Sequence, residues 1–171
     1  GTTLGVLEEN GSTLETVGND GTRKTVFISP LTSWVPYTAN SKLYVASAPS
    51  GRTLGALYEI TNGALTKVVG NLPGLQAQFG PSGVLVSTGG VNTVQLYVVR
   101  DGLLFTLPRA TLAEKCAWVD TRVLCAIPGA LPGALYPDAW LLGRVRTEDR
   151  LWFIDTVTNV ATEVVNPTDE N

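Results

Sequence analysis

The fold is decided by residues 53–71, which read Thr-Leu-Gly-Ala-Leu-Tyr-Glu-Ile-Thr-Asn-Gly-Ala-Leu-Thr-Lys-Val-Val-Gly-Asn. Two apolar, alternating runs flank Asn62-Gly63, and this dipeptide readily takes the positive φ angles that a two-residue hairpin turn needs. Residues 3–19 repeat the pattern, with Asn10-Gly11 at the turn and Val-Gly-Asn at the end. A third copy begins with Val94-Gln95-Leu96-Tyr97-Val98 and turns at Asp101-Gly102, and a fourth begins with Leu151-Trp152-Phe153-Ile154-Asp155 and turns near Thr158-Asn159.

A second type of hairpin lies between copies of the first, at residues 33–47, 76–87 and 115–127. An aromatic residue is expected to close its first strand each time, at Tyr37, Phe79 and Trp118. These aromatics are 42 and then 39 residues apart, and the turns at Asn62 and Asp101 are also 39 apart. The two hairpin types therefore recur together, with a period of about 40 residues.

A unit of about 40 residues with four antiparallel strands has the size of one β-propeller blade. We therefore expect an all-β chain of β-propeller blades, each a four-stranded antiparallel sheet, in an incomplete ring. The expected parts are a half-blade at 1–19, blades at 30–70 and 72–108, and a blade at 112–166 with an insertion at 128–146. A β-sandwich is the alternative, since it also has many short strands.

The second hairpin carries a family resemblance, in Phe79-Gly80-Pro81-Ser82-Gly83 and in Trp118-Val119-Asp120-Thr121-Arg122. Both segments resemble the strand-turn-strand motif of TolB-like and WD-type propellers. The resemblance implies a bacterial propeller of the cell envelope, outside the cytoplasm. It brings no functional residue with it, because the matching positions are structural.

An open row of blades would expose sheet edges and an apolar blade face. We expect the missing blades to come from a longer parent chain, and a second copy of this chain is the alternative. The chain has no Met, even at position 1, so we expect a processed or trimmed piece of a longer protein.

Cys116 and Cys125 flank the turn at Asp120-Thr121. If Val119 pairs with Arg122, the two cysteines face each other as a non-hydrogen-bonded pair, close enough for a disulfide. A disulfide would indicate an oxidising compartment: the periplasm, the cell surface or the secreted space. The alternative is a pair of reduced thiols on one face of a blade.

Composition excludes several kinds of function. The net charge is −3 and no basic block is present, so we expect no nucleic-acid partner. No apolar run of 18 residues could form a membrane span. Histidine is absent, which excludes Ser–His and Cys–His catalysis within this chain. We expect no cofactor and no metal site, because two cysteines without histidine cannot complete a zinc site.

The insertion at 128–146 offers the candidate binding residues Tyr136, Asp138 and Trp140. Loops inserted at blade edges are frequent binding surfaces, and Tyr and Trp combine a large contact area with a polar group. The alternative is that the two aromatics anchor the loop to its own blade. Carboxylates suited to glycosidase chemistry are also present, but no spacing pairs any two of them: they are Glu8, Glu9, Glu148, Asp149 and Asp155.

These observations predict a non-enzymatic binding or scaffolding module of an extracytoplasmic, cell-envelope protein, with a protein or a glycan as its partner. One alternative is part of a propeller-fold polysaccharide hydrolase or lyase. Another is a structural subunit of a surface lattice or a filament.

Overall fold

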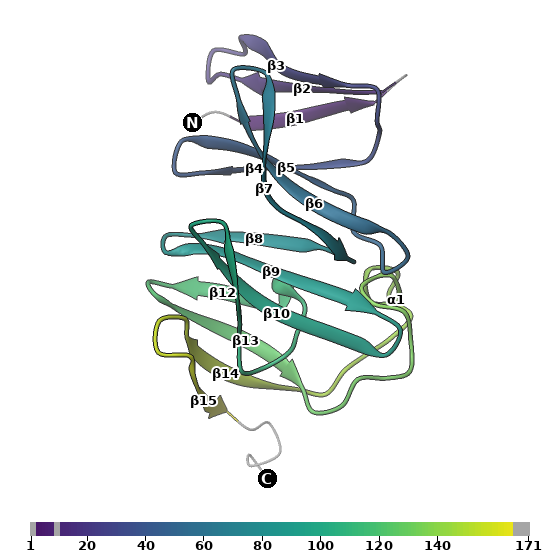
Figure 1. The fold of residues 1–171 in the computed structure, drawn as a ribbon, viewed down its shortest axis with the longest axis vertical. Helices are drawn as coiled ribbons and strands as arrows, with labels where there is room; N and C mark the ends of the chain where they lie inside the picture. Colours follow the sequence, from purple (N-terminus) through teal and green to yellow (C-terminus); the bar gives the residue numbers. More distant parts are fainter. Residues whose placement is uncertain (1–2, 9–10, 166–171) are drawn as a thin grey trace. The chain divides into compact units, whose positions relative to one another are not determined.

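The computed structural model describes residues 3–8 and 11–165, and within them the chain is all-β (Figure 1). Contacts divide the chain into two compact units. The smaller unit is Gly1–Ala48 with Gly55–Asn71, and the larger unit is Pro49–Leu54 with Leu72–Asn171. Each unit is described by itself below.

The smaller unit is built from two antiparallel sheets in which neighbouring strands follow one another along the chain. The first sheet has the order β1-β2-β3, and the second has the order β4-β5-β6-β7. The strands are β1 (Thr3–Glu8), β2 (Ser12–Val17), β3 (Arg23–Ser29), β4 (Trp34–Ala39), β5 (Lys42–Ser47), β6 (Leu54–Thr61) and β7 (Ala64–Pro73).

A hydrophobic core lies between these two sheets. Leu14 from β2 and Val45 from β5 are fully buried in it, and Ile60 from β6 is 8% exposed. Trp34 lies edge-on between Phe27 and Tyr58, with ring centroids 6.3 and 5.9 Å away, the geometry that aromatic pairs prefer. The alternation of apolar and polar residues along the strands therefore packs one sheet against the next.

The larger unit has two four-stranded antiparallel sheets, again with neighbours in chain order. Their orders are β8-β9-β10-β11 and β12-β13-β14-β15. The strands are β8 (Gln76–Gly80), β9 (Gly83–Gly90), β10 (Thr93–Arg100), β11 (Leu103–Thr106), β12 (Cys116–Val119), β13 (Arg122–Pro128), β14 (Asp149–Asp155) and β15 (Val160–Val165).

The turns have the backbone that their residues predict. Asn62 and Gly63 have φ angles of 51° and 76°, and Asp101 and Gly102 have 50° and 75°, as a type I′ hairpin turn requires. The predicted turn at Asn10-Gly11 falls partly outside the described residues, because Asn10 is not described.

The expected equivalence of the three aromatics is wrong for Tyr37. Phe79 and Trp118 stand directly before the last pair of their hairpins, whereas Thr38 occupies that position in β4. Tyr37 lies one residue earlier, and a one-residue offset moves a side chain to the other face of its sheet.

The core of the larger unit lies between its two sheets. The sheet β8–β11 contributes Leu85, Leu96 and Val98, and the sheet β12–β15 contributes Val123 and Ile154, all fully buried.

At the edge of this core, Trp118 lies directly on the backbone of Gly80. A Cβ at position 80 would overlap the indole ring, so only glycine leaves room for this contact. The close approach brings the β8–β9 and β12–β13 hairpins together, and the Ser82 hydroxyl donates to the Asp120 carbonyl at 3.1 Å.

The helical content of the described residues is a 3-10 turn, η1 (Ala113–Lys115), and one α-helical turn, α1 (Asp138–Leu141). The α-helical turn α1 lies within the insertion expected at 128–146. No helix in the described part of the chain is long and apolar enough to cross a membrane.

Candidate functional site

The segment between β13 and β14, residues 129–148, is the longest connection in the larger unit and contains α1. It runs beside the β9–β10 turn, where Val91 and Leu135 form an isolated antiparallel bridge. The Asn92 N–H donates to the Ala134 carbonyl, and the Ala134 N–H donates to the Asn92 side chain, both at 2.8 Å. The insertion is thus tied by its backbone to the sheet next to its own.

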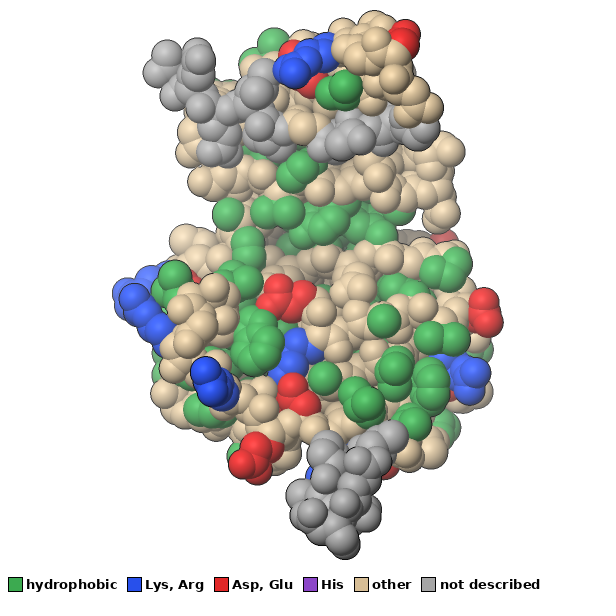
Figure 2. Space-filling model, turned by 180° about the vertical axis from the view of Figure 1, so that it is seen from behind, with side chains coloured by type: hydrophobic (Ala, Val, Ile, Leu, Met, Phe, Trp, Pro, Cys, Tyr) green, Lys and Arg blue, Asp and Glu red, His purple; other side chains and the backbone are tan. Residues whose placement is uncertain are grey.

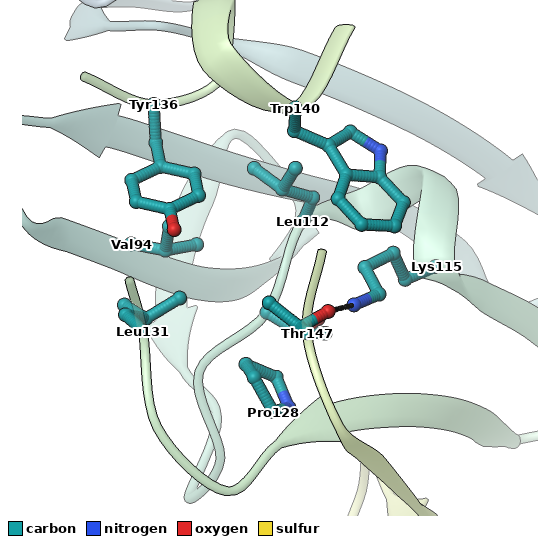
Figure 3. Close-up of a pocket in the computed structure, with 9 residues that line it drawn as sticks. Val94, Leu112, Lys115, Pro128, Leu131, Tyr136, Trp140 and Thr147 are labelled. Carbon is teal, nitrogen blue, oxygen red and sulfur yellow. Dashed lines mark hydrogen bonds between the residues drawn. The ribbon is translucent and has the colours of Figure 1, made fainter. Parts of the chain in front are cut away.

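Tyr136 is buried, with 1% of its surface exposed, in a small cluster with Val94 and Leu112 (Figure 3). Its hydroxyl donates to the Pro132 carbonyl at 3.0 Å, so the polar end of the ring is satisfied within the loop. Burial raises the pKa of this hydroxyl. Tyr136 therefore presents no surface to a partner in this structure.

Asp138 binds the segment 49–54 of the same unit. Its carboxylate accepts the Gly51 N–H at 2.6 Å and the Ser50 hydroxyl at 2.9 Å. Burial of the carboxyl opposes ionisation, but the hydrogen bonds from Gly51 and Ser50 outweigh it, so the pKa of Asp138 is lowered. The carboxylate is engaged in holding the insertion in place.

Trp140 covers a buried ion pair that the sequence did not reveal. The Lys115 ammonium lies 4.3 Å from the centre of the indole ring, in cation–π contact. It also contacts the Asp149 carboxylate at 2.6 Å and donates to the Thr147 hydroxyl at 2.8 Å. Only 7% of the Lys115 side chain is exposed, so this cation is almost enclosed.

A small hollow lies between Tyr136, Trp140 and Lys115 (Figure 3). Its volume is about 10 Å³, which is roughly one water position and too little for a ligand. The structure thus brings Tyr136, Asp138 and Trp140 together as anchors of one loop. Their role in recognition stays a prediction.

The large exposed apolar side chains of this loop directly follow Trp140 in the sequence. Leu141 and Leu142, at the end of α1, are 48% and 61% exposed. The residues predicted from the sequence, Tyr136, Asp138 and Trp140, are buried or partly buried in the same loop.

Cys116 and Cys125 form a disulfide, and the register Cys116↔Cys125 and Val119↔Arg122 is the one predicted. Their Cα atoms are 4.0 Å apart. Both cysteines are buried in the core between the two sheets, with 5% and 0% of their surfaces exposed. This disulfide is therefore part of the packing as well as a covalent link.

The other candidate carboxylates do not converge. Asp155 accepts the N–H groups of Thr158 and Val157 at 2.9 and 2.8 Å, and these bonds lower its pKa. Glu148 is exposed, while Glu9 and the side chain of Glu8 lie outside what the structure describes. Within the described ranges no group of three or more acidic or cysteine side chains could hold a metal ion.

On the face of the larger unit seen in Figure 2, acidic and basic side chains are scattered among groups of apolar ones. In comparisons with protein-family models, with curated proteins and with solved structures, nothing matches this chain.

Proposed function

We propose that this chain is a non-enzymatic binding or scaffolding module made of propeller-type blades. The observation that carries the proposal is the exposure of apolar side chains on firmly held segments that border the sheets. Leu141 and Leu142 project from an insertion held by Asp138 and by the β9–β10 turn. Exposed apolar residues on loops fixed by a rigid scaffold are typical of sites that bind proteins.

The blade assignment is supported by the succession of four-stranded antiparallel sheets in chain order. It is also supported by the way the facing sheets of the larger unit share one core. Two of the candidate carboxylates, Asp149 and Asp155, serve structural bonds, which favours binding over hydrolysis of a polysaccharide.

The location that we propose is outside the cytoplasm, in the periplasm, at the cell surface or secreted. The disulfide between Cys116 and Cys125 supports it, because such bonds persist mainly in oxidising compartments.

The face of the sheet β12–β15 that does not pack against β8–β11 is evidence for a further blade. Leu85 and Val98 are fully buried by the next sheet, while Leu124 and Phe153, at the same register positions one sheet later, are partly exposed. We assign the sheet that would cover them to a longer parent chain. Light scattering tests this assignment, and we expect the mass of a single chain. If the wild type is a dimer and Phe153→Glu makes it a monomer, the covering sheet belongs to a second copy instead.

The binding function is tested by capturing partners from a cell-envelope extract on the immobilised chain. We expect Leu141→Ser/Leu142→Ser to reduce capture while leaving the anchors Tyr136 and Trp140 intact. Ile28→Ser, at a site 71% exposed in the smaller unit, is the matched control. Equal recovery of every partner by all three proteins would exclude the loop as the binding surface.

A further inference from the structure

We propose a second binding site on the larger unit, at which strand β11 takes up a short extended peptide that carries an acidic side chain among apolar ones. This inference rests on the binding function proposed above and assigns it a class of partner. Four observations carry it: the open edge of β11, its exposed apolar residues, the groove beside it and the positive charge of Arg100 at the border of that groove.

β11 is the edge strand of its sheet, paired with β10 on one side. All four of its residues, Leu-Leu-Phe-Thr, are exposed, and Leu103 and Phe105 show 62% and 47% of their surfaces. Edge strands are usually protected by charges, proline or bulges, and β11 has none of these. Its outer edge is therefore open to pairing.

The hairpin register shows which backbone groups are available. Leu103 pairs with Arg100 next to the two-residue turn, so its N–H and C=O point toward β10. By the alternation of an antiparallel ladder, the N–H and C=O of Leu104 and Thr106 point outward. Two residues can thus hydrogen-bond an added strand, as in peptide recognition by β-augmentation.

A groove of about 350 Å³ runs beside β11, bounded on its other side by the β14–β15 turn. Phe105 and Leu104 line one wall, and Val157, 65% exposed, lines the other. The turn is held in position because the Thr156 hydroxyl donates to the Thr121 carbonyl at 2.7 Å. The groove therefore offers an apolar surface to side chains of a strand added at β11.

Arg100 supplies the charge preference. Its guanidinium lies 5.7 Å from the centre of the Phe105 ring and borders the groove. One terminal nitrogen, Nη2, is buried and has no hydrogen-bond partner within the described part of the chain. The peptide itself does not reach that buried nitrogen, but the rest of the guanidinium carries its positive charge to the border of the groove. A carboxylate is the acceptor that a guanidinium binds most strongly, so this charge favours an acidic side chain on the peptide.

The test is fluorescence polarisation with a labelled hexapeptide of alternating valine and glutamate, against the same peptide with lysine in place of glutamate. We expect the glutamate peptide to bind more tightly. Arg100→Gln should weaken its binding by about tenfold, as the loss of one charge-assisted hydrogen bond does, with little effect on the lysine peptide.

Leu104→Pro removes an outward N–H without removing a bond to β10, so it should abolish binding of both peptides. Leu104→Ala, which keeps that N–H, is its matched control, and thermal unfolding checks that each variant folds.

Equal binding of the two peptides, or binding unaffected by Leu104→Pro, would overturn the inference. The inference would also be overturned if the wild type were a dimer and Leu104→Pro a monomer, because a second copy of the chain would then occupy the edge of β11. Capture of envelope partners that persists in Leu104→Pro would leave the general binding function standing while this site fails.

Discussion

The carboxylate of Asp138 accepts the backbone N–H of Gly51 at 2.6 Å, although 87 residues separate the two in the chain. The contact is as close as it is because residue 51 is a glycine: a Cβ there would overlap the Tyr136 carbonyl oxygen. The insertion in the last sheet and the segment 49–54 thereby become one structural element of the larger unit.

Asp138→Ala should lower the free energy of unfolding by about 1–3 kcal/mol, because it leaves the Gly51 N–H and the Ser50 hydroxyl without their acceptor. Urea denaturation at neutral pH, followed by tryptophan fluorescence, measures the change. Asp101→Asn, at an exposed hairpin turn, is the control and should have little effect. Equal loss in both variants would contradict a special role for Asp138.

The same carboxylate predicts a dependence on acid. Its folded pKa lies below the ordinary value of 3.8, so its contribution to stability is fully present above that value and is lost as the pH falls through the folded pKa. The wild type should therefore lose more stability than Asp138→Asn when the pH is lowered from about 5 to about 2.5. Parallel pH profiles of the two proteins would show that the hydrogen bonds to Asp138 do not favour its ionised form.

Lys115→Met should destabilise the larger unit by about 3–5 kcal/mol, because it leaves the Asp149 carboxylate without its cation in an enclosed site. The double variant Lys115→Met/Asp149→Leu should recover much of that loss, since it removes both charges. A double-mutant cycle of unfolding free energies checks this. Additive effects of the two substitutions would contradict a coupled pair.

Gly80→Val should lower the melting temperature, because the added atoms would displace the Trp118 ring, and overpacking of this kind costs about 1–3 kcal/mol. Gly129→Ala is the matched control, since its Cβ would meet only the Glu148 carbonyl oxygen at an ordinary 3.8 Å. Similar melting temperatures for Gly80→Val and the wild type would show that the ring can move away at no cost.

Replacing both cysteines by alanine should destabilise the protein by about 2–3 kcal/mol, the amount that closure of so short a loop in the unfolded chain implies. Intact mass after alkylation in denaturant, with and without prior reduction, checks the bond in protein isolated from its native source. Two alkylated thiols without reduction would contradict both the disulfide and the extracytoplasmic location.

Short-range sequence patterns predicted many of the strands and turns, but they did not predict the side-chain contacts of the insertion between β13 and β14. The register of Cys116 and Cys125 followed from the two-residue turn between their strands, because turn length determines which residues face each other. The contacts of Lys115 with Trp140 and Asp149 could not be predicted, since they join residues that no periodic pattern relates. The contact between Ser50 and Asp138 could not be predicted either, because the two residues are 88 apart in the chain and no repeat relates them.

Strand β3 shows a further limit of the sequence pattern. The expected N-terminal hairpin ended at residue 19, yet β3 adds a third strand beyond the turn at residues 18–22. Its first residues, Arg23 and Lys24, are charged and exposed, so only Val26 and Phe27 signal its buried side.

The position of the disulfide inside the core makes it a reporter of local opening. Cys125 has no exposed surface, so a small thiol reductant can attack only after the β12–β13 hairpin has moved away from β8–β11. The rate of reduction in native buffer therefore measures how often this hairpin detaches. If it detaches without global unfolding, the rate will be insensitive to low urea; if the whole unit must unfold, the rate will rise steeply as urea is added.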